Sequence, residues 1–325
     1  MNERLNESRS TLNAAARPQD GPFCFEPVRN DDKPITEMLK IALPNKGRLA
    51  EETRELFEDA GLPIRARGER ALTASLGGEF EAIFVRAQDI PEFVADGAAD
   101  AGITGWDLVC ESERELDARL DLNFGRCRLV VAAREDSGIH HIDDITTGRV
   151  ATAFPHITRR FFDRPGCHVE VVPVSGAAEI APHLGIADIV VDLTSTGSTL
   201  KVNGLREVAT VLESTARLVT RVIDRDRIDP AKGRALDELA TALESVLRAR
   251  GQRYVMANVP RVALDRVKEV LPGLNGPTVI DILNGGQHVA VHAVVPETAI
   301  FRTIAQLKAL GGAGILVTRI ERLMP

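Results

Sequence analysis

The chain has 325 residues, of which 44% are hydrophobic and 27% are charged, the composition of an ordinary globular protein. This length exceeds that of one typical hydrophobic core, so we expect two or three domains. The net charge of −7 argues against a nucleic-acid-binding protein, and no stretch approaches the roughly 18 consecutive apolar residues of a membrane span. The four cysteines lack CxxC spacing and indicate reduced thiols. We therefore expect a cytoplasmic protein that binds neither nucleic acids nor membranes.

Residues 1–37 differ from the rest of the chain because they are polar and contain no sustained apolar run. A secretory signal needs an apolar core, which this segment lacks. A transit peptide is normally poor in acids, whereas acidic residues occur throughout this segment. We predict that residues 1–37 form a disordered extension.

From residue 39 onward, short β-like runs alternate with amphipathic helical stretches. This alternation predicts an α/β fold with mostly parallel strands. Helices are predicted at 49–60 and 90–97, and a turn into a helix is predicted at 141–144. Strands are predicted at 39–45, 81–87, 99–104, 127–134, 149–155, 168–174 and 187–193.

From residue 230 onward the predicted elements follow a different order. A long amphipathic helix at 230–250 is followed by the order strand, helix, strand, strand, helix, strand. That order is typical of the ferredoxin-like βαββαβ unit. The pattern predicts a larger α/β body with a separate C-terminal module of about 70 residues.

One turn, in DIVVDLTSTGSTL, is unusually rich in hydroxyl groups. An apolar strand ends at Asp192, and Leu193 leads into a turn around Gly197. In open α/β sheets such a turn, followed by a helix, offers amide and hydroxyl donors to an anion, while Asp192 could accept hydrogen bonds from a sugar. A plain helix cap with a glycine turn would look the same, and the segment alone leaves both interpretations open. The hydroxyl side chains are those of Thr194, Ser195, Thr196, Ser198 and Thr199.

The wider segment EIAPHLGIADIVVDLTSTGSTL, residues 179–200, resembles the signature of the ATP phosphoribosyltransferase family, which opens histidine biosynthesis. That signature has Glu, a Gly six residues later, a small residue, and then Val-x-Asp-Leu-x-x-Thr-Gly-x-Thr-Leu. Every position is matched here. The resemblance implies that residues 192–199 bind the 5′-phosphate and ribose of phosphoribosyl pyrophosphate.

Other segments extend the resemblance over nearly all of residues 38–325, among them LKIALPNKGRLAEET and YVMANVPRVALDRVKEVLPGLNGPTV. The family's long form implies a two-lobed, periplasmic-binding-protein-like catalytic part and a C-terminal ferredoxin-like regulatory domain. We place lobe I at 38–127 and 216–229, lobe II at 128–215, a connecting helix at 230–252 and the regulatory domain at 253–325. The resemblance also implies a homo-oligomer, from dimer to hexamer.

The implied reaction joins N1 of the adenine of ATP to C1 of the phosphoribosyl group and expels pyrophosphate. Polyanionic substrates need cations, and three basic residues follow predicted strands: Lys46, Arg48 and Arg86. For a single basic residue, a solvated surface position is the ordinary alternative. Mg²⁺ is expected as a cofactor, carried mainly by the substrate phosphates, so the sequence assigns it no protein ligands.

Several further residues are assigned roles by position. Asp107 and Glu179 are candidates for orienting the nucleotide, although Asp107 and Glu111, which share a helical face, could equally cap or solvate that helix. In the family the regulatory domain binds histidine as a feedback inhibitor, and Asn258 and Thr278 are our candidates for that site. The seven histidines show no metal-ligand spacing, and His288 and His292 share one side of a predicted strand.

Two other functions are compatible with parts of the sequence. A solute-binding protein would suit the two-lobed composition, but it would need export and would have no use for a βαββαβ domain. A non-catalytic subunit or effector-binding domain on the same fold is the other alternative, and no basic stripe or helix-turn-helix pattern supports it.

Overall fold

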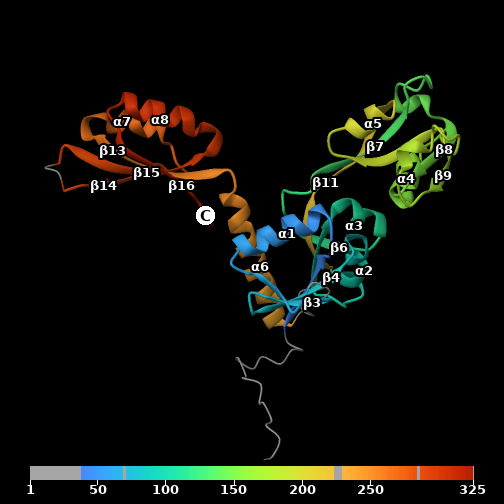
Figure 1. The fold of residues 1–325 in the computed structure, drawn as a ribbon, viewed down its shortest axis with the longest axis horizontal. Helices are drawn as coiled ribbons and strands as arrows, with labels where there is room; N and C mark the ends of the chain where they lie inside the picture. The colour runs from blue at the N-terminus through green and yellow to red at the C-terminus, as the bar shows by residue number, and fades with distance from the viewer. Residues whose placement is uncertain (1–37, 69–70, 223–228, 284–285, 325) are drawn as a thin grey trace, which may run out of the picture. The chain divides into compact units, whose positions relative to one another are not determined.

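The computed structural model describes residues 38–68, 71–222, 229–283 and 286–324, whose elements form three separate sheets (Figure 1). The predicted extension at 1–37 lies outside the described residues. Among the residues described, no helix combines the length and the apolarity that crossing a bilayer requires.

The first sheet, with its helices, is lobe I. Its seven strands have the order β2-β3-β4-β1-β5-β12-β6, in which β1 is parallel to both β4 and β5. Helices α1 (Arg48–Asp59), α2 (Ile90–Ala95) and α3 (Trp106–Ser112) follow β1, β4 and β5. The strands are β1 (Leu39–Pro44), β2 (Ile64–Ala66), β3 (Thr73–Leu76), β4 (Phe80–Val85), β5 (Ala101–Gly105), β6 (Leu116–Asp121) and β12 (Ala216–Arg221).

The second sheet, lobe II, has five strands in the order β11-β7-β10-β8-β9. Strands β8, β9 and β10 are mutually parallel, while β7 is antiparallel to β10 and β11. Helix α4 (Pro155–Phe162) follows β8, and the short α5 (Ser198–Val202) follows β10. The strands are β7 (Cys127–Arg134), β8 (Thr147–Thr152), β9 (His168–Pro173), β10 (Ile189–Thr194) and β11 (Leu205–Ser214).

The third sheet forms the C-terminal domain, with order β14-β15-β13-β16 and helices α7 (Leu264–Val270) and α8 (Ile300–Ala309) on one face (Figure 1). The predicted βαββαβ order is confirmed, with β13 (Gln252–Pro260), β14 (Thr278–Asp281), β15 (His288–Pro296) and β16 (Ala313–Arg319). Alternate residues Val255, Ala257 and Val259 of β13 are buried under the helices. This alternation is what the sequence pattern required.

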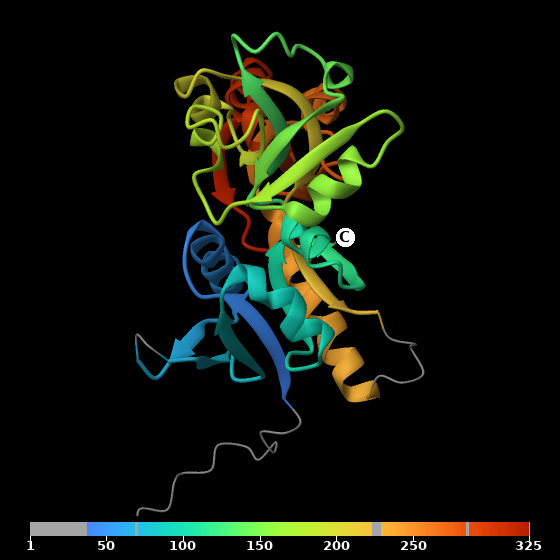
Figure 2. The same cartoon turned by 90° about the vertical axis from the view of Figure 1, so that its right-hand side faces the viewer.

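Helix α6 (Pro230–Ala249) belongs to lobe I by its packing. Its apolar residues Leu239, Leu243 and Val246 are almost fully buried in the lobe I core. In Figure 2 it runs, in orange, beside the blue and teal elements of that lobe. Asp229 caps the helix by accepting a hydrogen bond from the backbone N–H of Ala231.

The topology brings the carboxyl edges of both catalytic sheets to the interlobe connections. In lobe I, β12 is antiparallel to β5 and begins opposite Gly105. In lobe II, β11 ends at Ser214, opposite Cys127 and close to the end of β10. Both connections therefore leave lobe II at the edge that carries the hydroxyl-rich turn. The predicted α/β class, with two lobes of periplasmic-binding-protein type and a ferredoxin-like domain, is confirmed, while the residue boundaries of the domains stay a prediction.

Candidate active site

The hydroxyl-rich turn lies between β10 and α5, as predicted. Gly197 adopts φ +75, a left-handed conformation that favours glycine, and serves as the residue before the first turn of α5. Thr194 is buried, and its Oγ1 accepts a hydrogen bond from the Gly197 N–H at 2.8 Å. Thr194 therefore holds the turn from inside, and its hydroxyl is already engaged.

The outer hydroxyls of the turn are accessible. Ser195, Thr196, Ser198 and Thr199 are all exposed. Thr196 Oγ1 and Ser198 Oγ lie 2.9 Å apart and hydrogen-bond to each other. No side chain caps α5. The turn thus presents several donors to solvent around one glycine, which is the arrangement that an anion needs.

Two of the predicted carboxylates meet beside this turn. Asp192, on β10, lies beside the short helical turn Ala178–Ile180, which carries Glu179. Burial raises the pKa of the Asp192 carboxyl, and the negative charge of Glu179 adds to the effect, while the N–H of Leu193, at 2.7 Å, opposes it. Ala177, directly before the turn of helix that carries Glu179, has φ 51, a strained conformation for alanine.

The three predicted basic residues gather at the carboxyl edge of lobe I. Pro44, at the end of β1, pairs with Val85, at the end of β4. Lys46 and Arg48 follow the first of these strands and Arg86 follows the second, and all three are exposed. Arg48 Nε lies 3.3 Å from Glu52 Oε1 on α1. The structure thus brings Arg86 to the same edge as Lys46 and Arg48, which lie about 40 residues earlier in the sequence.

Asp107 occupies a different environment from the other site candidates. Its side chain is only 5% exposed, and Ser214 Oγ donates to its Oδ1 at 2.5 Å. The backbone N–H of Asp107 in turn donates to Ser214 Oγ at 3.0 Å. Burial raises the pKa of Asp107, and the hydrogen bond from Ser214 partly offsets that effect. This carboxylate joins the start of α3 to the end of β11.

Trp106, the neighbour of Asp107, reinforces the same junction. Its backbone N–H donates to the carbonyl of Thr215 at 3.0 Å. The guanidinium of Arg217 lies 4.1 Å from the centre of the Trp106 ring, a cation–π contact. The start of α3 is therefore held by polar and aromatic contacts to the segment that runs from the end of β11 into β12.

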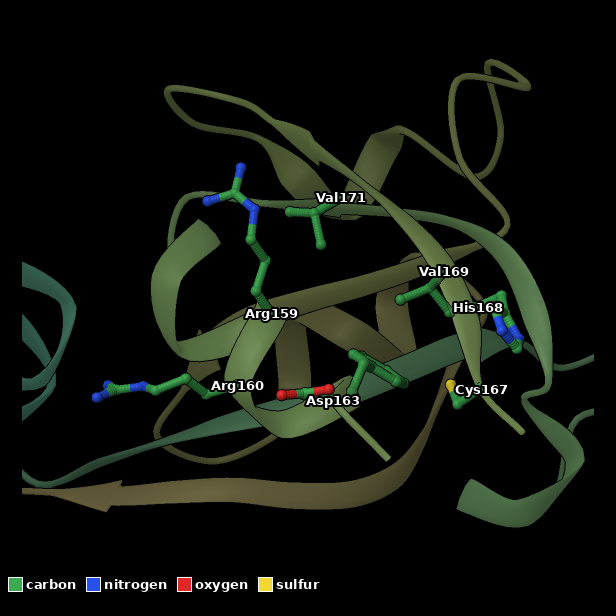
Figure 3. A pocket seen from close by; sticks show the side chains of 8 residues that line it. Arg159, Arg160, Asp163, Cys167, His168, Val169 and Val171 are labelled. Carbon is green, nitrogen blue, oxygen red and sulfur yellow. The ribbon is translucent and has the colours of Figure 1, made fainter. Parts of the chain in front are cut away.

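A hollow of about 370 Å³ lies on lobe II between α4 and β9 (Figure 3), and its lining contains no residue of the hydroxyl-rich turn. The residues that line it include Val169 and Val171 of β9, Arg159 and Arg160 of α4, and Asp163 directly after α4. Arg160 donates to the carbonyl of Cys110 on α3, so its charge is directed away from the hollow. None of the predicted site residues lines it, and the candidate site is therefore placed at the strand edges.

The two residues assigned to a regulatory site share the uncovered face of the C-terminal sheet. Thr278 lies directly opposite His292, and Asn258 lies opposite Ala290. His292 Nδ1 hydrogen-bonds with the hydroxyl of Tyr254, and their rings meet edge to face at 5.6 Å. Polar groups from three strands thus converge on a face that no helix of this domain covers.

The described side chains offer few ligands for a metal ion. Within the described ranges, no group of three or more His, Cys, Asp or Glu side chains is placed to hold a metal ion. Asp192 and Glu179 lie near each other beside the turn, and the negative charge of Glu179 contributes to the raised pKa of Asp192. This donor set is compatible with a metal ion that arrives on substrate phosphates and takes at most one or two protein ligands.

Comparison with known proteins decides the family. Residues 86–245 match the family model described as HisG, ATP phosphoribosyltransferase, and residues 249–322 match the model of the HisG C-terminal domain. The ATP phosphoribosyltransferase of Gemmatimonas aurantiaca is 71% identical over 292 residues, which cover 89% of this chain and 100% of that relative. This chain belongs to the ATP phosphoribosyltransferase family. It is thus a glycosyltransferase of histidine biosynthesis, in the long form with a C-terminal domain.

More distant members of the ATP phosphoribosyltransferase family agree. The relative from Haloarcula marismortui is 53% identical over 288 residues, covering 88% of this chain and 100% of its own. A solved structure described as the ATP phosphoribosyl transferase (HisG:HisZ) complex from Thermotoga maritima matches with a TM-score of 0.57 and 28% identity. It covers 65% of this chain and 99% of the solved chain. The present phosphoribosyltransferase therefore extends well beyond the portion that matches the solved Thermotoga maritima chain.

Sequence reasoning missed two residues of this phosphoribosyltransferase that join its lobes. Ser214 binds Asp107 from 107 positions away, and Glu111 caps a helix of the other lobe. Glu111 was predicted only to touch substrate or to cap its own helix. The available signal was that α4 begins Phe-Pro, a start with no capping side chain of its own.

Proposed function

We propose that this phosphoribosyltransferase joins N1 of the adenine of ATP to C1 of phosphoribosyl pyrophosphate, giving phosphoribosyl-ATP and pyrophosphate. The new C–N bond uses the lone pair of N1, and the broken C1–O bond leaves its electron pair on pyrophosphate. The observation that carries the proposal is the exposed hydroxyl turn beside the Asp192–Glu179 pair, in a chain of this family. We place the reaction in the cytoplasm, as the first step of L-histidine biosynthesis.

The turn from Thr194 to Thr199 is proposed to bind the 5′-phosphate. Gly197 leaves room, because a Cβ built there meets nothing within 4 Å, so a bulky anion can approach the backbone. Asp192, next to the turn, accepts hydrogen bonds from the ribose hydroxyls. Glu179, near Asp192, is proposed to orient the nucleotide or the ribose rather than to act as a strong base, since adenine N1 is already a nucleophile.

The basic residues at the carboxyl edge of the lobe I sheet are proposed to stabilise the negative charge that develops on the pyrophosphate leaving group. Lys46, Arg48 and Arg86 are exposed there and can reach phosphate oxygens. Mg²⁺, carried by the pyrophosphate, supplies further charge neutralisation when it is bound. Asp107 is proposed to act on the nucleotide through the position of α3, since its own carboxylate is held by Ser214.

A pyrophosphate-release assay tests this function. We expect release only when ATP and phosphoribosyl pyrophosphate are both present. Binding of one substrate without release would instead fit a solute-binding module, and no binding of either would fit a non-catalytic subunit. Release from phosphoribosyl pyrophosphate alone would contradict the proposed acceptor.

We further propose that histidine inhibits the enzyme by binding at the C-terminal domain. Asn258 and Thr278, with the Tyr254–His292 pair, offer donors and acceptors suited to an α-amino acid. The same face exposes apolar side chains, including Ile280 at 48% and Leu316 at 53%. Apolar surface of this kind is typical of a subunit contact, and we propose a homo-oligomer between dimer and hexamer.

Removing residues 252–325 should abolish inhibition by histidine while leaving the catalytic part active. The cut falls after α6, whose apolar face is buried in lobe I, so that helix stays in place. The measurement is the rate of pyrophosphate release against histidine concentration, for the full chain and for the shortened chain. Inhibition that persists in an active shortened chain would contradict the regulatory proposal.

A pair of full-length variants provides the control. Thr278→Val removes a hydroxyl from the proposed site and should weaken inhibition by about tenfold, the effect of one or two lost hydrogen bonds. Thr298→Val makes the same change at an exposed position in the helical turn after β15 and should leave inhibition unchanged.

A further inference from the structure

Helix α4 depends on another lobe for its amino-terminal cap. Phe154, the residue before the helix, offers no capping side chain, and Pro155 has no N–H to be satisfied. The next two N–H groups, those of His156 and Ile157, donate to Glu111 Oε1 and Oε2 at 2.9 and 3.0 Å. One carboxylate on α3 therefore satisfies the first two free donors of α4.

Three further contacts surround this cap. His156 Nδ1 lies 2.9 Å from Glu113 Oε2, and Arg160 donates to the carbonyl of Cys110 at 2.7 Å. Leu108 and Cys110 of α3 pack against the core of lobe II. The contact between α3 and α4 is thus a clasp, with the bidentate Glu111 carboxylate in its middle.

The clasp connects the two edges that carry the candidate site. Helix α4 follows β8, which is parallel to β10, so its amino end and the phosphate turn come from neighbouring strands. Helix α3 follows β5, whose neighbour β1 leads to Lys46. Glu111 therefore joins α4, whose strand neighbours the one that leads into the hydroxyl-rich turn, to α3, whose strand neighbours the one that leads to Lys46.

We propose that Glu111 is a positioning residue for the transfer reaction, fixing the phosphate turn of lobe II relative to the basic edge of lobe I. The inference rests on the proposed function. A carboxylate suits this role because it accepts two N–H bonds at once and its charge is favourable at a helix amino end. Glutamine has nearly the same size, but its side-chain amide offers one acceptor oxygen. Its NH₂ group would face the second backbone N–H, so that only one of the two hydrogen bonds could form.

The test compares Glu111→Gln with Glu207→Gln in the full-length chain. Glu207 gives the matched control, because it is a carboxylate of lobe II paired with Arg128 across β7 and β11, where it does not touch α4. We expect Glu111→Gln to speed hydrogen exchange at the amides of residues 156 and 157. We also expect it to lower kcat at least tenfold while the affinity for phosphoribosyl pyrophosphate stays within about twofold, because the turn itself is intact. Glu207→Gln should change none of these quantities.

Two results would overturn the proposal. Faster exchange with an unchanged kcat would make Glu111 a helix cap and nothing more, and unchanged exchange would show that the cap does not depend on the carboxylate. Glu111→Asp, which keeps the charge on a shorter arm, should recover part of kcat, and no recovery would argue against positioning. A wild-type chain that releases no pyrophosphate would instead defeat the proposed function, while the exchange measurement would still report on the clasp.

Discussion

Lys46→Ala is expected to lower kcat/KM by about 100-fold, the scale of losing one preorganised charge at a developing anion. Lys46 follows β1 at the edge where Arg86 follows β4, and it is exposed toward solvent at that edge. Arg48, by contrast, is already paired with Glu52. The measurement is steady-state pyrophosphate release with each substrate varied in turn. A greater loss in kcat than in affinity would indicate action on the leaving group.

Lys40 provides the control for this prediction. It lies on the same strand as Lys46 but near its amino end, where its backbone N–H donates to Asp100 at 2.9 Å. Lys40→Ala removes the same charge at the edge away from the proposed site and should leave kcat/KM within about twofold. Equal losses in both variants would mean that net charge, and not the position of Lys46, governs the rate.

The buried central strands could be predicted from the sequence because both of their faces are covered. β7 was predicted at 127–134, and the structure has it at Cys127–Arg134, with five consecutive buried residues. Helix α6 and the C-terminal order were also predicted correctly. The apolar residues of α6, β13 and β15 recur at helix and strand spacing, and those on the face toward the core are buried in the structure.

The strands at the sheet margins were missed for a physical reason. β6, LDARLD, alternates half-buried with exposed residues and carries three charges, so no apolar run marks it. β11 is interrupted by register shifts after Glu207 and Thr210, which break the period of two. A helix was predicted to follow the turn at 141–144, and this is wrong, because a short helical turn there leads directly into β8.

One part of the candidate site could be predicted from contiguous residues, whereas another part depends on residues that are distant in the sequence. The phosphate turn could be found because its hydroxyls and glycine are contiguous in the sequence. The clasp could not, because Glu111 and its partners are 45 and 46 residues apart and lie on helices of different lobes. Hydrogen-bond partners of that kind follow from the tertiary fold, and no periodicity in the sequence encodes them.

Gly197→Ala is expected to lower kcat/KM for phosphoribosyl pyrophosphate by roughly 100-fold, the effect of weakening about two hydrogen bonds to a charged phosphate. The added Cβ meets nothing within 4 Å, so the change acts through the backbone. With φ at +75, alanine is disfavoured by about 1–2 kcal/mol, and the turn is expected to relax and move its N–H groups. Kinetics with each substrate varied in turn, together with thermal unfolding, measure the two effects.

Gly138 allows the backbone cost to be separated from the loss of the site. It also has φ +75 and open space around a built Cβ, and it lies in an exposed turn of lobe II after β7. Gly138→Ala should therefore lower the unfolding temperature about as much as Gly197→Ala, because both glycines leave the same conformation. Only Gly197→Ala should weaken the use of phosphoribosyl pyrophosphate, since only that turn carries the exposed hydroxyls beside Asp192. Similar kinetics for the two variants would show that the turn at Gly197 is not part of the binding site.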